Sequence, residues 1–206
     1  MKPKLHIVIS STRPGRVGPA VAHWFNEFAR QHSLFEVRLV DLADFKLPIY
    51  DEPRHPAVQQ YEHAHTQAWS ASVAEADAFV FVTPEYNFNP PPSLVNALNY
   101  VYREWNYKAC GFVSYGGVSG GLRAVQSAKL LVTTLKMMPM VEGVAVPMVG
   151  QSLDARGAFA SNKLIDLSAQ QMLDELFKWT EALASLRPRA TDPVQAASDT
   201  RVAAPA

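Results

Sequence analysis

The chain lacks the features of several protein classes. Its 206 residues include a single cysteine, Cys110, which excludes an intramolecular disulfide, and the surrounding apolar run ACGFVSY predicts a buried structural thiol. The 19 basic and 19 acidic residues balance, which argues against a nucleic-acid surface and against a polybasic membrane anchor. No apolar run has the length of a membrane span or a signal peptide, so we expect a soluble, cytoplasmic protein.

Three motifs are also missing from the sequence. No lysine followed by Ser or Thr ends a Walker loop, which argues against nucleotide hydrolysis of the P-loop type. Gly15 and Gly18 have no third glycine in register, so the dinucleotide fingerprint is absent. The six histidines are scattered, and His63 and His65, two apart on an expected helix, should point to different faces. We therefore expect no metal site.

The segment HIVISSTRPGRVG at residues 6–18 organises the chain. A β-branched apolar run, typical of a central parallel strand, is followed by three hydroxyl side chains, two arginines and two glycines. The helical pattern that follows begins with free N–H groups and a positive dipole end, which favour an anion. A cluster of this kind is often only a turn, but the segment also predicts a loop that binds a phosphomonoester.

Apolar periodicity predicts five strands that alternate with five helices. Strict alternation implies a three-layer α/β sandwich, with a parallel sheet and helices on both faces, and the order 2-1-3-4-5 fits the burial of the strands best. Residues 1–186 then form one domain, and residues 187–206, without apolar periodicity, a disordered tail. The strands are expected at about 6–9, 35–42, 79–82, 110–115 and 141–148, and the helices at about 17–28, 58–76, 93–105, 122–136 and 161–186.

Three unusual loops should meet at the carboxyl edge of this sheet, where ligands of such folds bind. The first loop suits a phosphate. The turn at 84–87 offers backbone N–H groups and an aromatic ring, and residues 115–117 offer a second ring and bare backbone. A flat heterocycle with polar edges, stacked near tyrosines, matches these features. Together they predict a site for flavin mononucleotide (FMN).

Over about residues 4–186 the chain resembles the NAD(P)H-dependent FMN reductases and quinone reductases of the flavodoxin-like group. The resemblance lies in SSTRPGR at 10–16, in PEYN at 84–87 followed by LVNALN at 94–99, and in SYGG at 114–117. It implies that Ser11, Arg13, Arg16 and the amide of Val17 hold the FMN phosphate. It also implies that the flavin ring lies between Pro84, Glu85, Tyr86 and Asn87 on one side and Ser114, Tyr115, Gly116 and Gly117 on the other.

The same resemblance implies an oxidoreductase that assembles as a homodimer or homotetramer. NADPH or NADH would give hydride to the flavin, and a small-molecule acceptor such as a quinone, free flavin, azo compound or metal oxyanion would take the electrons by a ping-pong mechanism. No acid or base is assigned, because loop carboxylates such as Glu85 are mostly solvated.

Several alternatives stay open at this point. An electron carrier of the flavodoxin type would bind the same FMN, although the neutral charge of this chain argues against it. A flavin-binding sensor without turnover is a second alternative. The aromatic segment YVYREWNYK at residues 100–108 suits a subunit interface, the rim of the site or simple packing.

Overall fold

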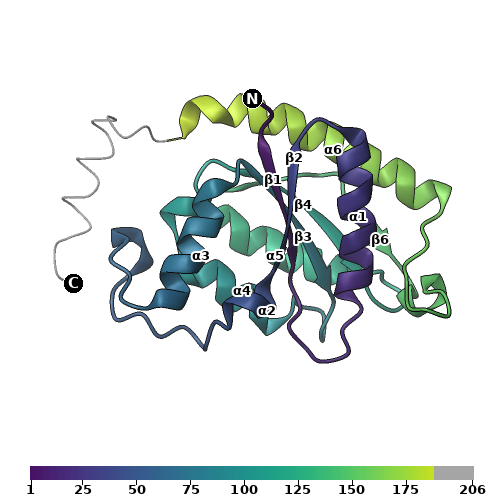
Figure 1. The fold of residues 1–206 in the computed structure, drawn as a ribbon, viewed down its shortest axis with the longest axis horizontal. Helices are drawn as coiled ribbons and strands as arrows, with labels where there is room; N and C mark the ends of the chain where they lie inside the picture. Colours follow the sequence, from purple (N-terminus) through teal and green to yellow (C-terminus); the bar gives the residue numbers. More distant parts are fainter. Residues whose placement is uncertain (188–206) are drawn as a thin grey trace.

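The centre of the structure is a parallel β-sheet. A computed structural model describes residues 1–187, and Figure 1 shows the strands running through the middle of the molecule. Their order is β2-β1-β3-β4-β5, with β6 also paired to β4, so the predicted order is confirmed. The strands are β1 (Lys4–Ile9), β2 (Glu36–Asp41), β3 (Ala78–Pro84), β4 (Ala109–Tyr115), β5 (Met138–Pro139) and β6 (Val144–Val146).

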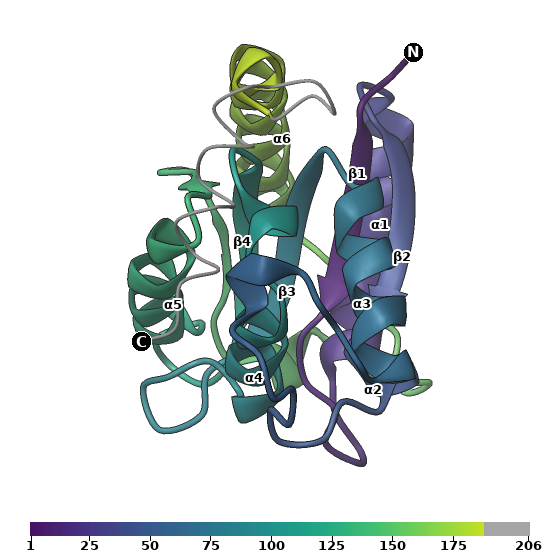
Figure 2. The same ribbon diagram turned by 90° about the vertical axis from the view of Figure 1, so that its left-hand side faces the viewer.

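Helices cover both faces of the sheet, as Figures 1 and 2 show. Ile7 and Ile9 of β1 pack toward α1 and α6, whereas Val8 packs toward α3, α4 and α5, because successive side chains of a strand point to opposite faces. The predicted sandwich of flavodoxin-like type is confirmed. The helices are α1 (Gly18–His32), α2 (Leu42–Phe45), α3 (Ala64–Glu75), α4 (Pro92–Tyr100), α5 (Leu122–Thr134) and α6 (Lys163–Leu183), with short 3-10 turns at Pro56–Val58, Arg103–Trp105, Val149–Ser152 and Ala184–Leu186.

Of the last predicted strand, 141–148, only residues 144–146 form a strand, β6. Two short strands pair with β4 instead, β5 at its beginning and β6 at its end. Pro139 and Pro147 carry no N–H and cannot continue a ladder, and residues 141–143 between the two strands adopt no strand conformation. The predicted strand is therefore shorter than expected and β5 is an additional strand before it, although both lie at the predicted edge of the sheet.

Two predicted helices are shorter than expected. The helix expected over 58–76 begins only at Ala64, because Gln59 has a positive φ of 54° and the carboxylate of Glu52 accepts hydrogen bonds from the N–H groups of Glu62 and His63. The helix expected over 93–105 ends at Tyr100, and a 3-10 turn follows it. The first boundary depends on contacts from Glu52, ten and eleven positions earlier in the chain, that local periodicity does not contain.

Two predictions about single residues concern the core. Cys110 is fully buried, as expected, and burial raises the pKa of its thiol. Trp105, in the aromatic segment with three open interpretations, is also fully buried. Its indole N–H donates to the carbonyl of Leu98 at 3.2 Å, and its ring packs 4.9 Å from that of Phe79. Packing is therefore the role of Trp105.

His6 makes the stability of the fold depend on pH. Its side chain is buried beside Phe79, and its Nε2 has no hydrogen-bond partner. Burial, and then the charge of Arg38, lower the pKa of His6 from 6.5 to about 4. Between these values the unfolded chain binds more protons than the folded one, so the free energy of unfolding falls as the pH falls through this window.

We expect His6→Gln to remove part of this acid sensitivity. The pKa difference lowers the free energy of unfolding by roughly 3 kcal/mol between pH 7 and pH 4. The variant should lose this dependence of stability on pH. Urea unfolding at pH 7.0, 5.5 and 4.5 measures it, with His23→Gln, which removes an exposed imidazole, as control. Identical slopes in wild type and His6→Gln would contradict the assignment.

Two expectations concern regions beyond this sandwich. The expected tail, 187–206, lies outside the described residues except for Arg187. No helix in residues 1–187 has both the length and the apolar character needed to cross a membrane.

Candidate functional site

Three loops that are distant in sequence meet at the carboxyl edge of the sheet. The hydroxyl of Ser11, after β1, lies 2.8 Å from the hydroxyl of Tyr86, after β3. The N–H of Glu85 donates to the carbonyl of Tyr115, at the end of β4, at 3.3 Å. Ser93, at the start of α4, donates from its hydroxyl to the carbonyl of Ser10 at 2.5 Å. The expected convergence of the loops is therefore present.

The first loop has the donor set of an anion site. Helix α1 has no side-chain cap and no acidic residue in its first turn, so its positive end is not neutralised locally. Among the described residues, the N–H groups of Thr12 and Val17 donate to no protein acceptor. The hydroxyl of Ser10 and the Nε of Arg16 are buried without a partner. Buried groups of this kind normally have partners, and a phosphate would supply the acceptors.

The two arginines of this loop differ in their surroundings. Arg16 forms an ion pair with Asp41, and its side chain is only 17% exposed. Asp41 also accepts a hydrogen bond from the N–H of Ala43 and so caps α2. Arg13 is exposed, and its guanidinium has no partner among residues 1–187. Arg13 thus offers its whole guanidinium to a ligand, whereas one terminal nitrogen of Arg16 is already bonded to Asp41.

The turn after β3 is a tight hairpin. Tyr86 and Asn89 exchange two backbone hydrogen bonds of 2.8 and 3.0 Å. The two residues between them, Asn87 and Phe88, have positive φ values of 50° and 71°, an uncommon conformation for side chains other than glycine. The side chain of Phe88 is 61% exposed. Backbone strain of this kind is typical of functional sites.

Glu85 is buried rather than solvated, contrary to the expectation for a loop carboxylate. Its side chain is 7% exposed, forms an ion pair with Arg123, and accepts hydrogen bonds from the Ser119 hydroxyl and the Arg123 N–H at 3.0 and 3.2 Å. The bond from Arg123 is the largest cause that lowers the pKa of Glu85. The Arg123 guanidinium also stacks 3.8 Å from the ring centre of Phe88. Glu85 thus fixes the turn to the first residues of α5.

The ring of Tyr115 is buried under the loops, whereas the sequence predicted a ring exposed to the ligand. It is 4% exposed, and burial raises the pKa of its phenol. A Cβ on Gly18 would lie 2.8 Å from the Tyr115 hydroxyl, so a larger residue at the start of α1 would require the Tyr115 ring to shift. A Cβ added to Gly117, by contrast, would have no atom within 4 Å. Open space above this backbone is what a planar ligand requires.

The remaining residues of the third loop hold its shape. The Ser114 hydroxyl donates to the carbonyl of Gly120 at 2.8 Å. Gly120 and Gly121 have positive φ values of 60° and 84°. A Cβ on Gly121 would lie 3.0 Å from the backbone N and O of Tyr115. The loop geometry therefore requires glycine at these two positions, whereas Gly116 and Gly117 are predicted to contact the ligand.

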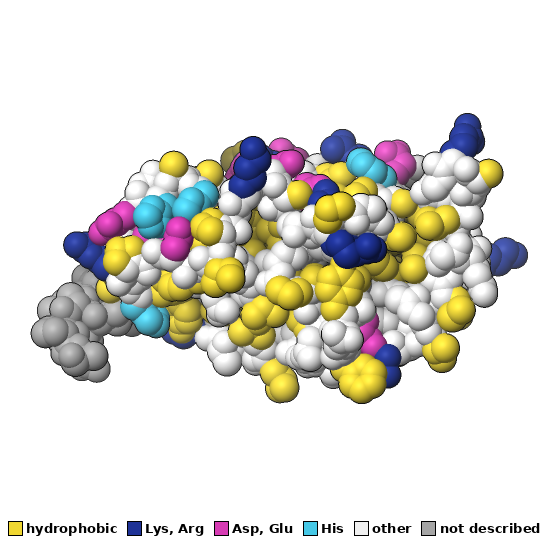
Figure 3. Space-filling view, turned by 90° about the horizontal axis from the view of Figure 1, so that it is seen from below, with side chains coloured by type: hydrophobic (Ala, Val, Ile, Leu, Met, Phe, Trp, Pro, Cys, Tyr) yellow, Lys and Arg dark blue, Asp and Glu magenta, His cyan; other side chains and the backbone are white. Residues whose placement is uncertain are grey.

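A cleft opens next to the three loops. Its volume is about 680 Å³, and no charged side chain lines it. Figure 3 views this side of the molecule, where hydrophobic side chains form a band across the face. The lining residues are Thr12, Leu47, Ile49, Tyr50, Pro90, Pro92, Ser93, Val95, Asn96 and Asn99.

The histidine pair predicted to face apart does not do so. The rings of His63 and His65 stack with centroids 5.2 Å apart, and each Nε2 lies near Asp51. The reason is that α3 begins at Ala64, so His63 is an extended residue before the helix. In residues 1–187 no group of three or more His, Cys, Asp or Glu side chains is arranged to hold a metal ion.

The fold and its edge loops define a flavodoxin-like protein, and known proteins agree. FerB from Paracoccus denitrificans, a flavoenzyme NAD(P)H:(acceptor) oxidoreductase, superposes with a TM-score of 0.69 at 18% identity, covering 87% of this chain and 98% of that one. At this identity the likeness shows the fold alone. A family model described as NADPH-dependent FMN reductase matches residues 3–151. The chain belongs to this family, which confirms the predicted class of oxidoreductase.

Individual relatives carry similar names. An NAD(P)H-dependent FMN reductase of Schizosaccharomyces pombe is 43% identical over 121 residues, which is 58% of this chain and 60% of that protein. Another from Nectria sp is 33% identical over 150 residues, 70% of this chain and 75% of that protein. A quinone reductase of Escherichia coli is 32% identical over 149 residues, 68% of this chain and 76% of that protein.

Proposed function

We propose that the protein binds FMN at the three loops and uses it to transfer electrons from NADPH or NADH to a small-molecule acceptor. The observation that carries this proposal is the contact between Ser11 and Tyr86, which joins the loop suited to a phosphate with the turn suited to a flat ring. The uncapped start of α1 and the unpartnered Ser10 hydroxyl and Arg16 Nε fit a phosphate at the first loop.

Each loop has its own part in holding the cofactor. Ser11, Arg13, Arg16 and the amide of Val17 bind the phosphate. The ring lies along Pro84, Glu85, Tyr86 and Asn87 and is closed at its other edge by Ser114, Tyr115, Gly116 and Gly117. The backbone N–H groups of Asn87 and Gly117, which donate to no acceptor within residues 1–187, provide hydrogen bonds to its polar edge. Tyr115 acts from beneath, by fixing the start of α1.

FMN, when bound, supplies hydride acceptance and electron transfer to the second substrate. The chain itself orients the reactants and stabilises charge with main-chain donors. Glu85 moves no proton in this scheme, because its carboxylate is bound to Arg123 and Ser119. It keeps the turn against α5 and so fixes the backbone beside the ring.

The cleft beside the loops favours one class of acceptor. Because no charged side chain lines it, it suits a neutral planar molecule such as a quinone, free flavin or azo compound better than a metal oxyanion. Donor and acceptor use the same exposed flavin face in turn, which gives a ping-pong mechanism. Assembly as a homodimer or homotetramer, which the family resemblance implies, is part of the same proposal.

Spectroscopy of the purified protein tests this proposal. We expect a flavin absorption spectrum, FMN as the released compound, bleaching by NADPH or NADH under anaerobic conditions, and recovery on addition of benzoquinone. Steady-state rates should give parallel double-reciprocal lines. Protein that carries flavin but oxidises neither NADH nor NADPH would contradict the reductase and favour the electron carrier or the sensor.

A further inference from the structure

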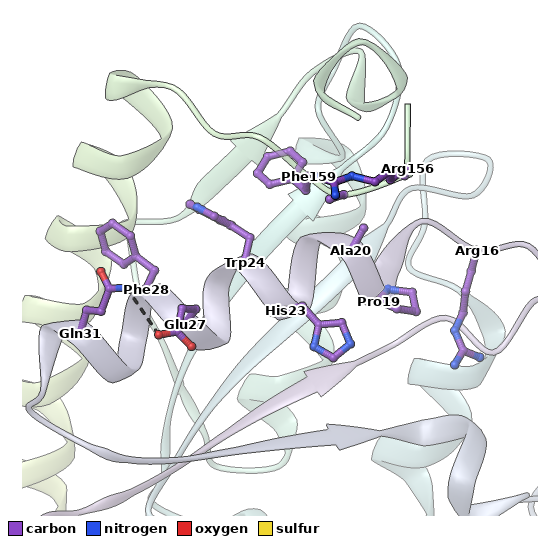
Figure 4. A pocket seen from close by; sticks show the side chains of 12 residues that line it. Arg16, Pro19, Ala20, His23, Trp24, Glu27, Phe28, Gln31, Arg156 and Phe159 are labelled. Atoms are coloured by element: carbon purple, nitrogen blue, oxygen red, sulfur yellow. Dashed lines mark hydrogen bonds between the residues drawn. The ribbon is translucent and has the colours of Figure 1, made fainter. Parts of the chain in front are cut away.

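A second cavity lies along α1, away from the cleft beside the three loops. It has a volume of about 660 Å³ and lies between this helix and the segment 156–159 (Figure 4). Trp24, Phe28 and Phe159 form an aromatic wall, with the ring centroids of Trp24 and Phe159 5.1 Å apart. Its volume and aromatic lining are those of small-molecule sites.

The wall opposite α1 is a hydrogen-bonded turn. The carboxylate of Asp154 accepts hydrogen bonds from the N–H groups of Arg156 and Ala158, both at 2.8 Å. The N–H of Asp154 donates to the carbonyl of Ala158 at 2.9 Å, and Leu153 pairs with Phe159. These bonds fix the turn in the absence of a ligand, so the cavity is preformed.

Polar groups lie at the two ends of the aromatic wall. At the end nearer the first loop is Arg156, whose side chain is 91% exposed and only loosely paired with Asp154 at 3.8 Å. At the other end are Glu27 and Gln31, whose side chains touch at 3.5 Å (Figure 4). Along the cavity a ligand therefore meets a cation, then aromatic rings, then a carboxylate and an amide.

We propose that this cavity binds the adenosine phosphate part of an adenine nucleotide. Arg156 pairs with a phosphate, and the base stacks among Trp24, Phe28 and Phe159. Gln31 and Glu27 accept hydrogen bonds from the exocyclic amine, the pairing by which glutamine recognises adenine elsewhere. Under the function proposed above, on which this step rests, the nucleotide is the NAD(P)H donor, because Arg16 belongs both to the cavity and to the first loop.

Titration calorimetry of 5′-AMP into the FMN-loaded protein tests the site without turnover. We expect saturable binding of one AMP per chain. Trp24→Leu should weaken it about tenfold through lost stacking, and Arg156→Ala about tenfold through the lost phosphate contact. Lys163→Ala removes an exposed cation that does not line the cavity and should leave AMP affinity unchanged. Circular dichroism of each variant checks that it is folded.

Steady-state kinetics then test whether the nucleotide that occupies the cavity is the hydride donor NADPH. If the donor occupies the cavity, AMP competes with NADPH, and Arg156→Ala raises the KM for NADPH about tenfold with kcat unchanged. AMP that binds without competing would overturn the donor assignment. Absence of AMP binding, or equal losses in Arg156→Ala and Lys163→Ala, would overturn the site itself. Neither result depends on whether the protein binds FMN or oxidises NADPH, and these two measurements test the proposed function separately.

Discussion

Replacing Gly121 by alanine is expected to destabilise the protein by about 3 kcal/mol and to abolish FMN binding. Gly121 has a φ of +84°, and an added Cβ would lie 2.9 Å from the Cβ of Ser114 and 3.0 Å from the backbone N and O of Tyr115. Backbone atoms at the end of a central strand have little freedom to move aside. The strain therefore shifts the loop at 114–117, which is the proposed edge of the flavin site.

Gly157→Ala is the matched control, because it separates backbone strain from the steric clash. Gly157 has a similar φ of +79°, but no atom lies within 4 Å of its added Cβ. We expect it to cost only about 1 kcal/mol and to leave FMN affinity unchanged. Urea denaturation and flavin titration of the two variants measure both effects. Equal losses of stability in the two variants would show that the close contact with Tyr115 adds nothing to the destabilisation by Gly121→Ala.

The sheet was predictable from sequence because its signals are local. Strands β1, β3 and β4 contain continuous apolar runs, which are typical of strands buried on both faces of a parallel sheet. Strand β2 alternates, as an edge strand should. Once these positions are fixed, right-handed crossovers leave few windings. The order of the sheet and the meeting of the three loops both follow from that winding.

The partners of the charged residues were not predictable in the same way. Arg16 pairs with Asp41, and Arg123 with Glu85, which are 25 and 38 residues away. Neither pair has the three- or four-residue spacing that marks a pair on one helix. Each pair forms only because the winding brings two loop ends together. The sequence indicated Arg16 as a phosphate ligand, but it did not indicate the carboxylate that pairs with either arginine.

The nucleotide cavity proposed along α1 was likewise not predictable, because it also forms where the fold brings distant segments together. Its aromatic wall joins Trp24 and Phe28 to Phe159, more than a hundred positions later in the chain. The sequence alone indicates only an apolar helix face, which normally packs in a core. The turn at Asp154, with its two hydrogen bonds to backbone N–H groups, fixes residues 156–159 opposite α1.

Reversing the charge of Arg13 is expected to weaken FMN binding about 100-fold without loss of stability. Arg13 is the exposed arginine of the first loop, and its guanidinium has no partner in residues 1–187, so Arg13→Glu breaks no contact within the described part of the chain. A carboxylate at this position repels the phosphate and removes a charge-assisted hydrogen bond. Fluorescence titration of the apoprotein with FMN measures the change, and urea denaturation checks the fold.

Lys2→Glu makes the same change in net charge at an exposed site on the opposite edge of the sheet, and it should leave FMN affinity unchanged. Riboflavin, which has the ring without the phosphate, should bind wild type and Arg13→Glu equally. This comparison assigns the effect to one end of the ligand. If Arg13→Glu binds FMN as wild type does, the phosphate lies away from Arg13. Ser11, the half-buried Arg16 and the backbone at Val17 would then hold it without Arg13.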